Sequence, residues 1–134
     1  EHYQKYSMKY IKQICDAIDE VPVTVFAKGA YFARQEMRHL NCQTIGLDWN
    51  MDIQESRRLI GEGKTLQGNL DPCALYGTTA EIETATRKML DGFGTGRHIA
   101  NLGHGAYPDT NPDKVKVFVN TVKEYSAVMH STSD

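Results

Sequence analysis

The stretch Ile99-Ala-Asn-Leu-Gly-His-Gly-Ala-Tyr-Pro108 changes abruptly from an apolar run to loop-forming residues. Its apolar part predicts a strand over 98–102 that ends at Gly103. His104 then lies between Gly103 and Gly105, and the two glycines allow the backbone to turn sharply beside the imidazole. Because binding residues of α/β proteins lie just past the carboxyl ends of strands, His104 is a candidate ligand-binding residue. A loop histidine that faces water is the alternative.

The rest of the chain alternates between apolar runs typical of strands and amphipathic patterns typical of helices. The expected strands cover 21–27, 44–47, 65–69 and 98–102. The expected helices cover 5–19, 30–40, 52–60, 80–91 and 112–129, with Thr79 as the N-cap of the fourth and a loop or short helix from Asp71. This order predicts an α/β fold with about four parallel strands and flanking helices.

Two of these segments have a distinctive composition. The run Val21–Ala27 is β-branched and does not alternate, which is typical of a strand buried on both faces. The segment 5–19 carries apolar residues at the spacing of an amphipathic helix: Tyr6, Tyr10, Ile11, Ile14, Ala17 and Ile18.

Composition excludes several classes of protein. A chain of 134 residues with 40% hydrophobic and 24% charged residues is typical of one globular domain. A net charge of -2 without a basic cluster argues against a nucleic-acid partner, and no apolar run approaches the ~18 residues of a membrane span. Three scattered cysteines favour reduced thiols over disulfides or a structural zinc site. The chain begins at Glu1 rather than methionine, which indicates processing or a piece of a longer protein.

Polar residues follow each of the four expected strands. Lys28, Asp48, Asn69 and His104 lie at or just past the carboxyl ends, which share one face of a parallel sheet, so we expect them to converge on one pocket. Arg97 and His98 enter their strand at the opposite end and are expected to be structural.

Each supporting residue also has a purely structural interpretation. Asp48 would accept hydrogen bonds from the next loop, Asn69 would stabilise a turn, and Lys28 would extend into solvent or pair with a carboxylate. In the same way, Trp49 would belong to the core and Tyr107 would serve loop packing instead of lining a pocket.

Four segments resemble the uroporphyrinogen decarboxylase family. They are Phe26-Ala-Lys-Gly29, Gly46-Leu-Asp-Trp49, Leu66-Gln-Gly-Asn-Leu-Asp-Pro-Cys-Ala-Leu-Tyr76 and the stretch Ile99–Pro108. The resemblance runs from near residue 1 to about residue 128. It implies that the chain, over 1–134, is the C-terminal half of a (β/α)8 TIM barrel, with the N-terminal half of the barrel absent.

The resemblance also implies a function. Enzymes of this family are lyases that decarboxylate the four acetate side chains of uroporphyrinogen to give coproporphyrinogen in haem biosynthesis, without a cofactor or metal. The resemblance further implies a homodimer in the cytoplasm, or in a plastid as for some members of the family. The family's histidine contact to substrate falls on His104, whereas its pyrrole-binding aspartate and its arginines belong to the N-terminal half. We therefore expect no catalytic residue in this chain and no activity from it alone.

Two other functions are weighed against this one. The first is a non-enzymatic half-barrel that serves as an assembly module. The second is a relative of the corrinoid-linked methyltransferases, which carry His-x-Cys zinc ligands at the end of the strand resembling 22–28. Phe26 and Lys28 stand at those positions, and neither can bind zinc in that way, so the metal site of that family is missing.

Overall fold

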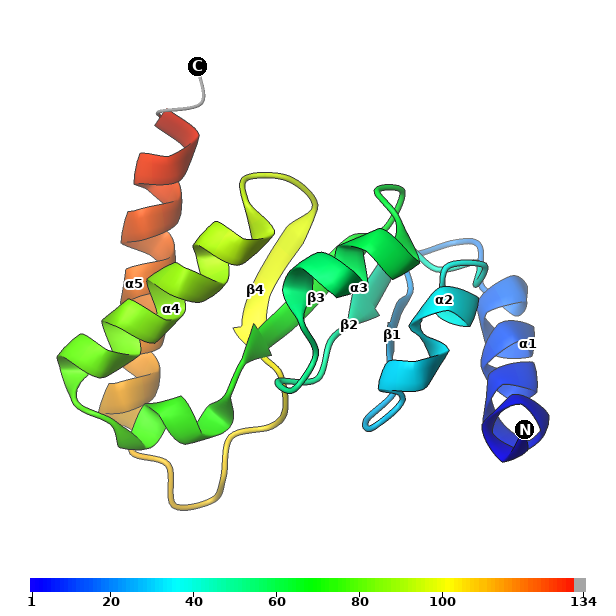
Figure 1. The fold of residues 1–134 in the computed structure, drawn as a ribbon, viewed down its shortest axis with the longest axis horizontal. Coiled ribbons are helices and arrows are strands. Elements are labelled where there is room, and N and C mark those ends of the chain that lie inside the picture. Colours follow the sequence, from blue (N-terminus) through cyan, green and yellow to red (C-terminus); the bar gives the residue numbers. More distant parts are fainter. Residues whose placement is uncertain (132–134) are drawn as a thin grey trace.

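The computed structural model describes residues 1–131 and contains one sheet of four parallel strands (Figure 1). The strands are β1 (Thr24–Phe26), β2 (Thr44–Gly46), β3 (Thr65–Leu70) and β4 (His98–Leu102). Each strand pairs with the next along the chain, so β1 and β4 form the two edges of the sheet. The predicted arrangement of four parallel strands with flanking helices is confirmed.

Helical segments precede, connect and follow the strands. They are η1 (Gln4–Met8), α1 (Lys9–Ala17), η2 (Tyr31–Ala33), α2 (Arg34–Met37), α3 (Ile53–Ile60), η3 (Pro72–Tyr76), α4 (Thr79–Phe93) and α5 (Pro112–Ser131). Figure 1 shows α1 at the β1 end of the sheet and α4 with α5 at the β4 end. Within residues 1–131, the structure contains no helix with the length and apolar character needed to cross a membrane.

Side-chain caps fix where two of the helices begin. The Asp52 carboxylate accepts a hydrogen bond from the Glu55 N–H at the start of α3. Thr78 and Glu81 form a reciprocal capping box at the start of α4. The N-cap of α4 is therefore Thr78, and the predicted Thr79 is wrong by one residue. Thr78 is the threonine with a glutamate three positions later, which the capping box requires.

Alternate strand residues divide the sheet into a helical face and an open face. On the helical face, Ile45 and Leu66 are partners across β2 and β3, and both are fully buried in the core beneath the helices. The open face carries a row of successive partners across all four strands: Phe26, Gly46, Gln67 and Ile99. Phe26 and Ile99 are each 45% exposed. The open face therefore presents apolar side chains without a second layer from residues 1–131.

The burial predicted for 21–27 is wrong. Strand β1 has only three residues, Val21 and Phe26 are exposed, and Val25 is half-buried against the core of the helical face. The β-branched composition correctly indicated a strand. Burial on both faces fails because β1 is an edge strand whose open face is uncovered by the described residues.

The apolar residues of the N-terminal helix also divide between two directions. Met8 and Cys15 are buried, and Ile11 packs against the same core. Tyr6 and Ile14 are exposed, together with Tyr10. The helix is therefore amphipathic as predicted, but only part of its apolar pattern contacts the described part of the protein.

Candidate active site at the carboxyl ends of the strands

The four residues singled out from the sequence lie at one end of the sheet. Lys28 and Asp48 each follow the last residue of their strand by two positions, and so does His104 after β4. Asn69 is the penultimate residue of β3, which extends one residue further than predicted. We call these residues, Lys28, Asp48, Asn69 and His104, the carboxyl-end site.

Two members of this site touch directly. The Nζ atom of Lys28 lies 3.3 Å from Nε2 of His104. Lys28 is exposed, whereas His104 is half-buried. A lysine ammonium beside an imidazole is an arrangement suited to an anionic ligand group, because both side chains can present N–H donors to a carboxylate.

Asp48 and Asn69 hold backbone segments in place. Asp48 is 3% exposed, and its carboxylate accepts a hydrogen bond of 2.5 Å from the Gly29 N–H. The Asn69 side-chain amide donates to the carbonyls of Asp48 and Met51 at 2.9 and 2.8 Å. These contacts are structural in kind. Asp48 restrains the loop that carries Lys28, although that loop follows β1 and is not the next loop along the chain.

Close backbone packing sets the position of His104. A Cβ atom on Gly103 would lie 2.2 Å from the backbone nitrogen of Trp49. Only glycine therefore lets the segment after β4 pass the segment after β2 so closely. The Gly103 N–H also donates to the Leu70 carbonyl at 2.8 Å. The chain therefore enters the histidine loop from a fixed point. Trp49 itself is 49% exposed and is not a core residue.

An aromatic group borders the histidine loop. The rings of Tyr76 and Tyr107 lie 6.3 Å apart, and the Tyr76 hydroxyl donates to Asp109 at 2.5 Å. This hydrogen bond raises the pKa of Tyr76. The negative charge that a Cys73 thiolate would carry, together with partial burial, raises the pKa of Tyr107. Tyr76 and Cys73 were not predicted as neighbours of the site, although their position just after β3 was an available signal in the sequence.

Arg97 and His98 lie at the amino end of β4, away from the carboxyl-end site, as predicted. The His98 ring stacks on Phe93 with 3.7 Å between centroids and donates from Nε2 to the Gly68 carbonyl. Burial lowers the pKa of His98. Arg97 donates to the Gly63 carbonyl.

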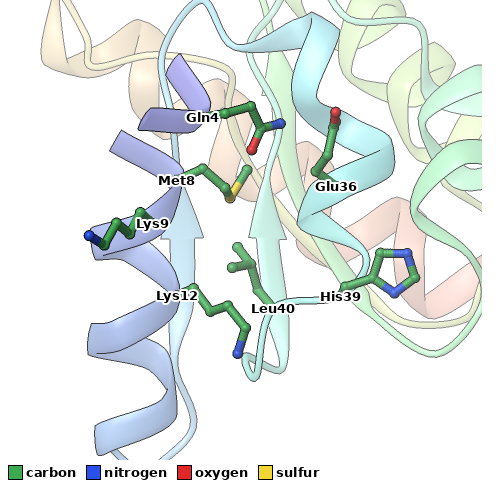
Figure 2. Close-up of a pocket in the computed structure, with 7 residues that line it drawn as sticks. All are labelled: Gln4, Met8, Lys9, Lys12, Glu36, His39 and Leu40. Atoms are coloured by element: carbon green, nitrogen blue, oxygen red, sulfur yellow. The ribbon is translucent and has the colours of Figure 1, made fainter. Parts of the chain in front are cut away.

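A separate pocket of about 280 Å³ lies between the N-terminal helix and α2 (Figure 2). It is lined by Gln4, Met8, Lys9, Lys12, Glu36, His39 and Leu40. Met8 and Leu40 point toward each other across it, whereas Lys9 points away. A hollow of about 530 Å³ includes Asn69 and Trp49 in its lining and so adjoins the carboxyl-end site. Within residues 1–131, His, Cys, Asp and Glu side chains form no group of three placed to hold a metal ion.

Comparison with known proteins gives a consistent result. The family model described as uroporphyrinogen decarboxylase (URO-D) matches residues 1–125. The chain is 39% identical to mouse uroporphyrinogen decarboxylase, with 96% of this chain and 38% of the mouse protein covered. The corresponding protein of Christiangramia forsetii is 44% identical, with coverage of 92% and 36%. The chain thus spans little more than a third of the length of these relatives.

A solved structure shows the same fold. A methyltransferase from Methanosarcina mazei superposes with a TM-score of 0.78 over 92% of this chain and 36% of its own. The two sequences are 16% identical, so this likeness concerns the fold alone.

Proposed function

The chain belongs to the uroporphyrinogen decarboxylase family, and we propose that it is part of a lyase that removes CO2 from the four acetate side chains of uroporphyrinogen to give coproporphyrinogen. The observation that carries this proposal is the family match over residues 1–125, which includes the whole carboxyl-end site. Because the chain spans 38% of the mouse relative, the activity is that of a larger protein.

Within that protein, His104 binds the substrate at the carboxyl ends of the strands. The substrate carries carboxylate side chains, and a site with the Lys28 ammonium 3.3 Å from the imidazole suits such a group electrostatically. Asp48 and Asn69 support the site through the backbone segments that they hold. The reaction uses no cofactor, because a protonated pyrrole ring of the substrate accepts the electrons released when the carboxylate leaves.

The rest of the enzyme completes the barrel. Both sheet edges, β1 and β4, are unpaired in the described residues, and the open face exposes Phe26 and Ile99. Four further strands would pair these edges and cover this face, as in a closed eight-stranded barrel. The groups that hold the pyrrole nitrogens belong to that part, and this chain supplies substrate-binding residues without a catalytic one.

Two alternatives are less well supported. A zinc-dependent methyltransferase would need metal ligands at the end of β1, where Phe26 and Lys28 lie. A non-enzymatic assembly module would not need a lysine and a histidine in contact at the carboxyl ends. By analogy with the family, we also propose a homodimer in the cytoplasm, or in a plastid; the three free cysteines fit a reducing compartment.

Assaying the intact protein that contains this chain for coproporphyrinogen formation tests the proposal. We expect sequential loss of four CO2 from uroporphyrinogen without added metal or cofactor. An intact protein that leaves uroporphyrinogen unchanged under anaerobic conditions would contradict the proposal and favour the assembly module.

A further inference from the structure

Asn101 is a polar residue on the open face of β4, close to the carboxyl end of the strand. The side chains of Ala100 and Leu102 pack against the core of the helical face. Those of Ile99 and Asn101 are exposed. Because successive strand residues alternate between the two faces of a sheet, Ile99 and Asn101 both lie on the open face. Asn101 is the nearer of the two to the carboxyl end, three positions before His104.

A hydrogen bond to the backbone fixes the orientation of the Asn101 amide. Its Oδ1 atom accepts from the Leu102 N–H at 2.8 Å. A backbone N–H requires an acceptor, so the oxygen of the amide, and not its NH2 group, must face it. The Nδ2 atom is therefore directed away from this contact, and it has no hydrogen-bond partner in the described part of the chain. Asn101 thus presents two N–H donors on the open face.

These two donors need an acceptor in the intact protein. The open face becomes the interior of the barrel once further strands cover it, and a donor buried without an acceptor costs free energy. Ile99 lies deeper along β4, where apolar side chains fill the interior of such a barrel. Asn101 lies in the layer next to the carboxyl ends, where barrels of this kind bind their ligands. A ligand that carries acceptor atoms is therefore the partner that this position favours.

We propose that Asn101 is a further substrate-binding residue, whose NH2 group donates a hydrogen bond to a side-chain carboxylate of uroporphyrinogen. This inference rests on the proposed function and adds a neutral donor to the contact that His104 makes. The carboxylates are the acceptor groups of this substrate, whereas its pyrrole nitrogens carry N–H donors. Both the acetate and the propionate side chains of the substrate supply such a carboxylate, and binding experiments distinguish the two.

The substitution Asn101→Asp separates substrate binding from the structural role of the side chain. An aspartate keeps an oxygen for the Leu102 N–H, but it lacks both donors and repels a carboxylate. In the intact protein, we expect KM for uroporphyrinogen to rise about ten- to hundredfold, as for a lost hydrogen bond to a charged group, with kcat changed far less. The melting temperature should stay close to that of the unmodified protein. Asn101→Ala removes the bond to Leu102 as well, so it should raise KM and also lower the melting temperature.

Asn120→Asp is the matched control. Asn120 is exposed on α5, and its replacement makes the same change of charge away from the open face. This variant should leave KM unchanged. Two results would overturn the proposal. One is an unchanged KM in Asn101→Asp, since the NH2 group would then bind an acceptor within the protein. The other is an equal rise of KM in Asn120→Asp, which would show an effect of net charge alone.

Fluorescence titration of the intact protein with two stable porphyrins provides a readout that does not depend on turnover. Uroporphyrin carries acetate and propionate side chains, whereas coproporphyrin carries propionates and methyl groups. Weaker binding of both to Asn101→Asp supports a contact with a propionate, and weaker binding of uroporphyrin alone supports a contact with an acetate. Binding of both porphyrins as tight as in the unmodified protein refutes the proposal. If the intact protein forms no coproporphyrinogen, the proposed function fails, and these titrations still decide the role of Asn101.

Discussion

The Nζ atom of Lys28 lies 3.3 Å from Nε2 of His104, although the strands that precede these residues, β1 and β4, are opposite edges of the sheet. The two residues are 76 positions apart in the sequence. Their contact crosses the carboxyl end of the sheet and encloses the ends of β2 and β3 between them. It makes the site a product of the whole fold, and damage to either edge strand should disturb it.

Replacing the histidine should weaken catalysis without abolishing it. In the intact protein, we expect His104→Ala to lower kcat/KM by about 1.5–3 kcal/mol, or roughly ten- to 150-fold, because the imidazole contacts a peripheral carboxylate of the substrate and does not take part in the chemical step. Steady-state kinetics with uroporphyrinogen measure this loss. A fall of more than about 10⁴-fold, or ~5.5 kcal/mol, would instead assign His104 to the chemical step.

Gly103 should be among the least replaceable residues of the site. A Cβ atom there would lie 2.2 Å from the backbone nitrogen of Trp49. The two segments that meet at this point are both backbone, so neither has much room to move. We expect Gly103→Ala to destabilise the protein by about 1–3 kcal/mol, the usual cost of overpacking, and to lower kcat/KM because the histidine loop is displaced. Thermal denaturation measures the first effect.

Gly105→Ala is the matched control for this change. A Cβ atom at Gly105 meets nothing within 4 Å. The melting temperature of the Gly105→Ala variant should therefore stay close to that of the unmodified protein. Equal destabilisation by both substitutions would show that loop flexibility, and not the approach to Trp49, decides the requirement for glycine.

The sequence predicts the regular part of this fold well and its contacts less well. Strand positions follow from local apolar runs, and the placement of His104 past β4 follows from its flanking glycines. The exposure of Phe26 could not be predicted, because it depends on whether another layer covers the open face of the sheet. The partner of Lys28 could not be predicted either, because the contact depends on how two loops from opposite edges approach each other.

His98 should make stability depend on pH. Burial lowers its pKa from the ordinary value of 6.5, so the unfolded chain binds the proton more tightly than the folded protein. The contribution of the neutral ring is fully present above about pH 6.5 and is lost as the pH falls through the lowered folded pKa. We expect the melting temperature to decrease between about pH 7 and pH 5, and His98→Phe to reduce this decrease. His39→Asn, at an exposed histidine, is the control and should preserve the slope.

The last prediction concerns residues 1–134 by themselves. Over residues 1–131, the two sheet edges are unpaired and the open face has Phe26 and Ile99 each 45% exposed. These features favour association, because unpaired strand edges and apolar patches bind other chains. We expect the purified chain to form dimers or larger species in light scattering and to leave uroporphyrinogen unchanged. Replacing both Phe26 and Ile99 by serine should reduce association, whereas Val21→Ser, at an exposed valine outside the sheet, should not. Adding the N-terminal half of a family member should restore activity if it pairs with these edges. A monomer that decarboxylates uroporphyrinogen unaided would contradict both the half-barrel and the assignment of the chemical step to another part of the enzyme.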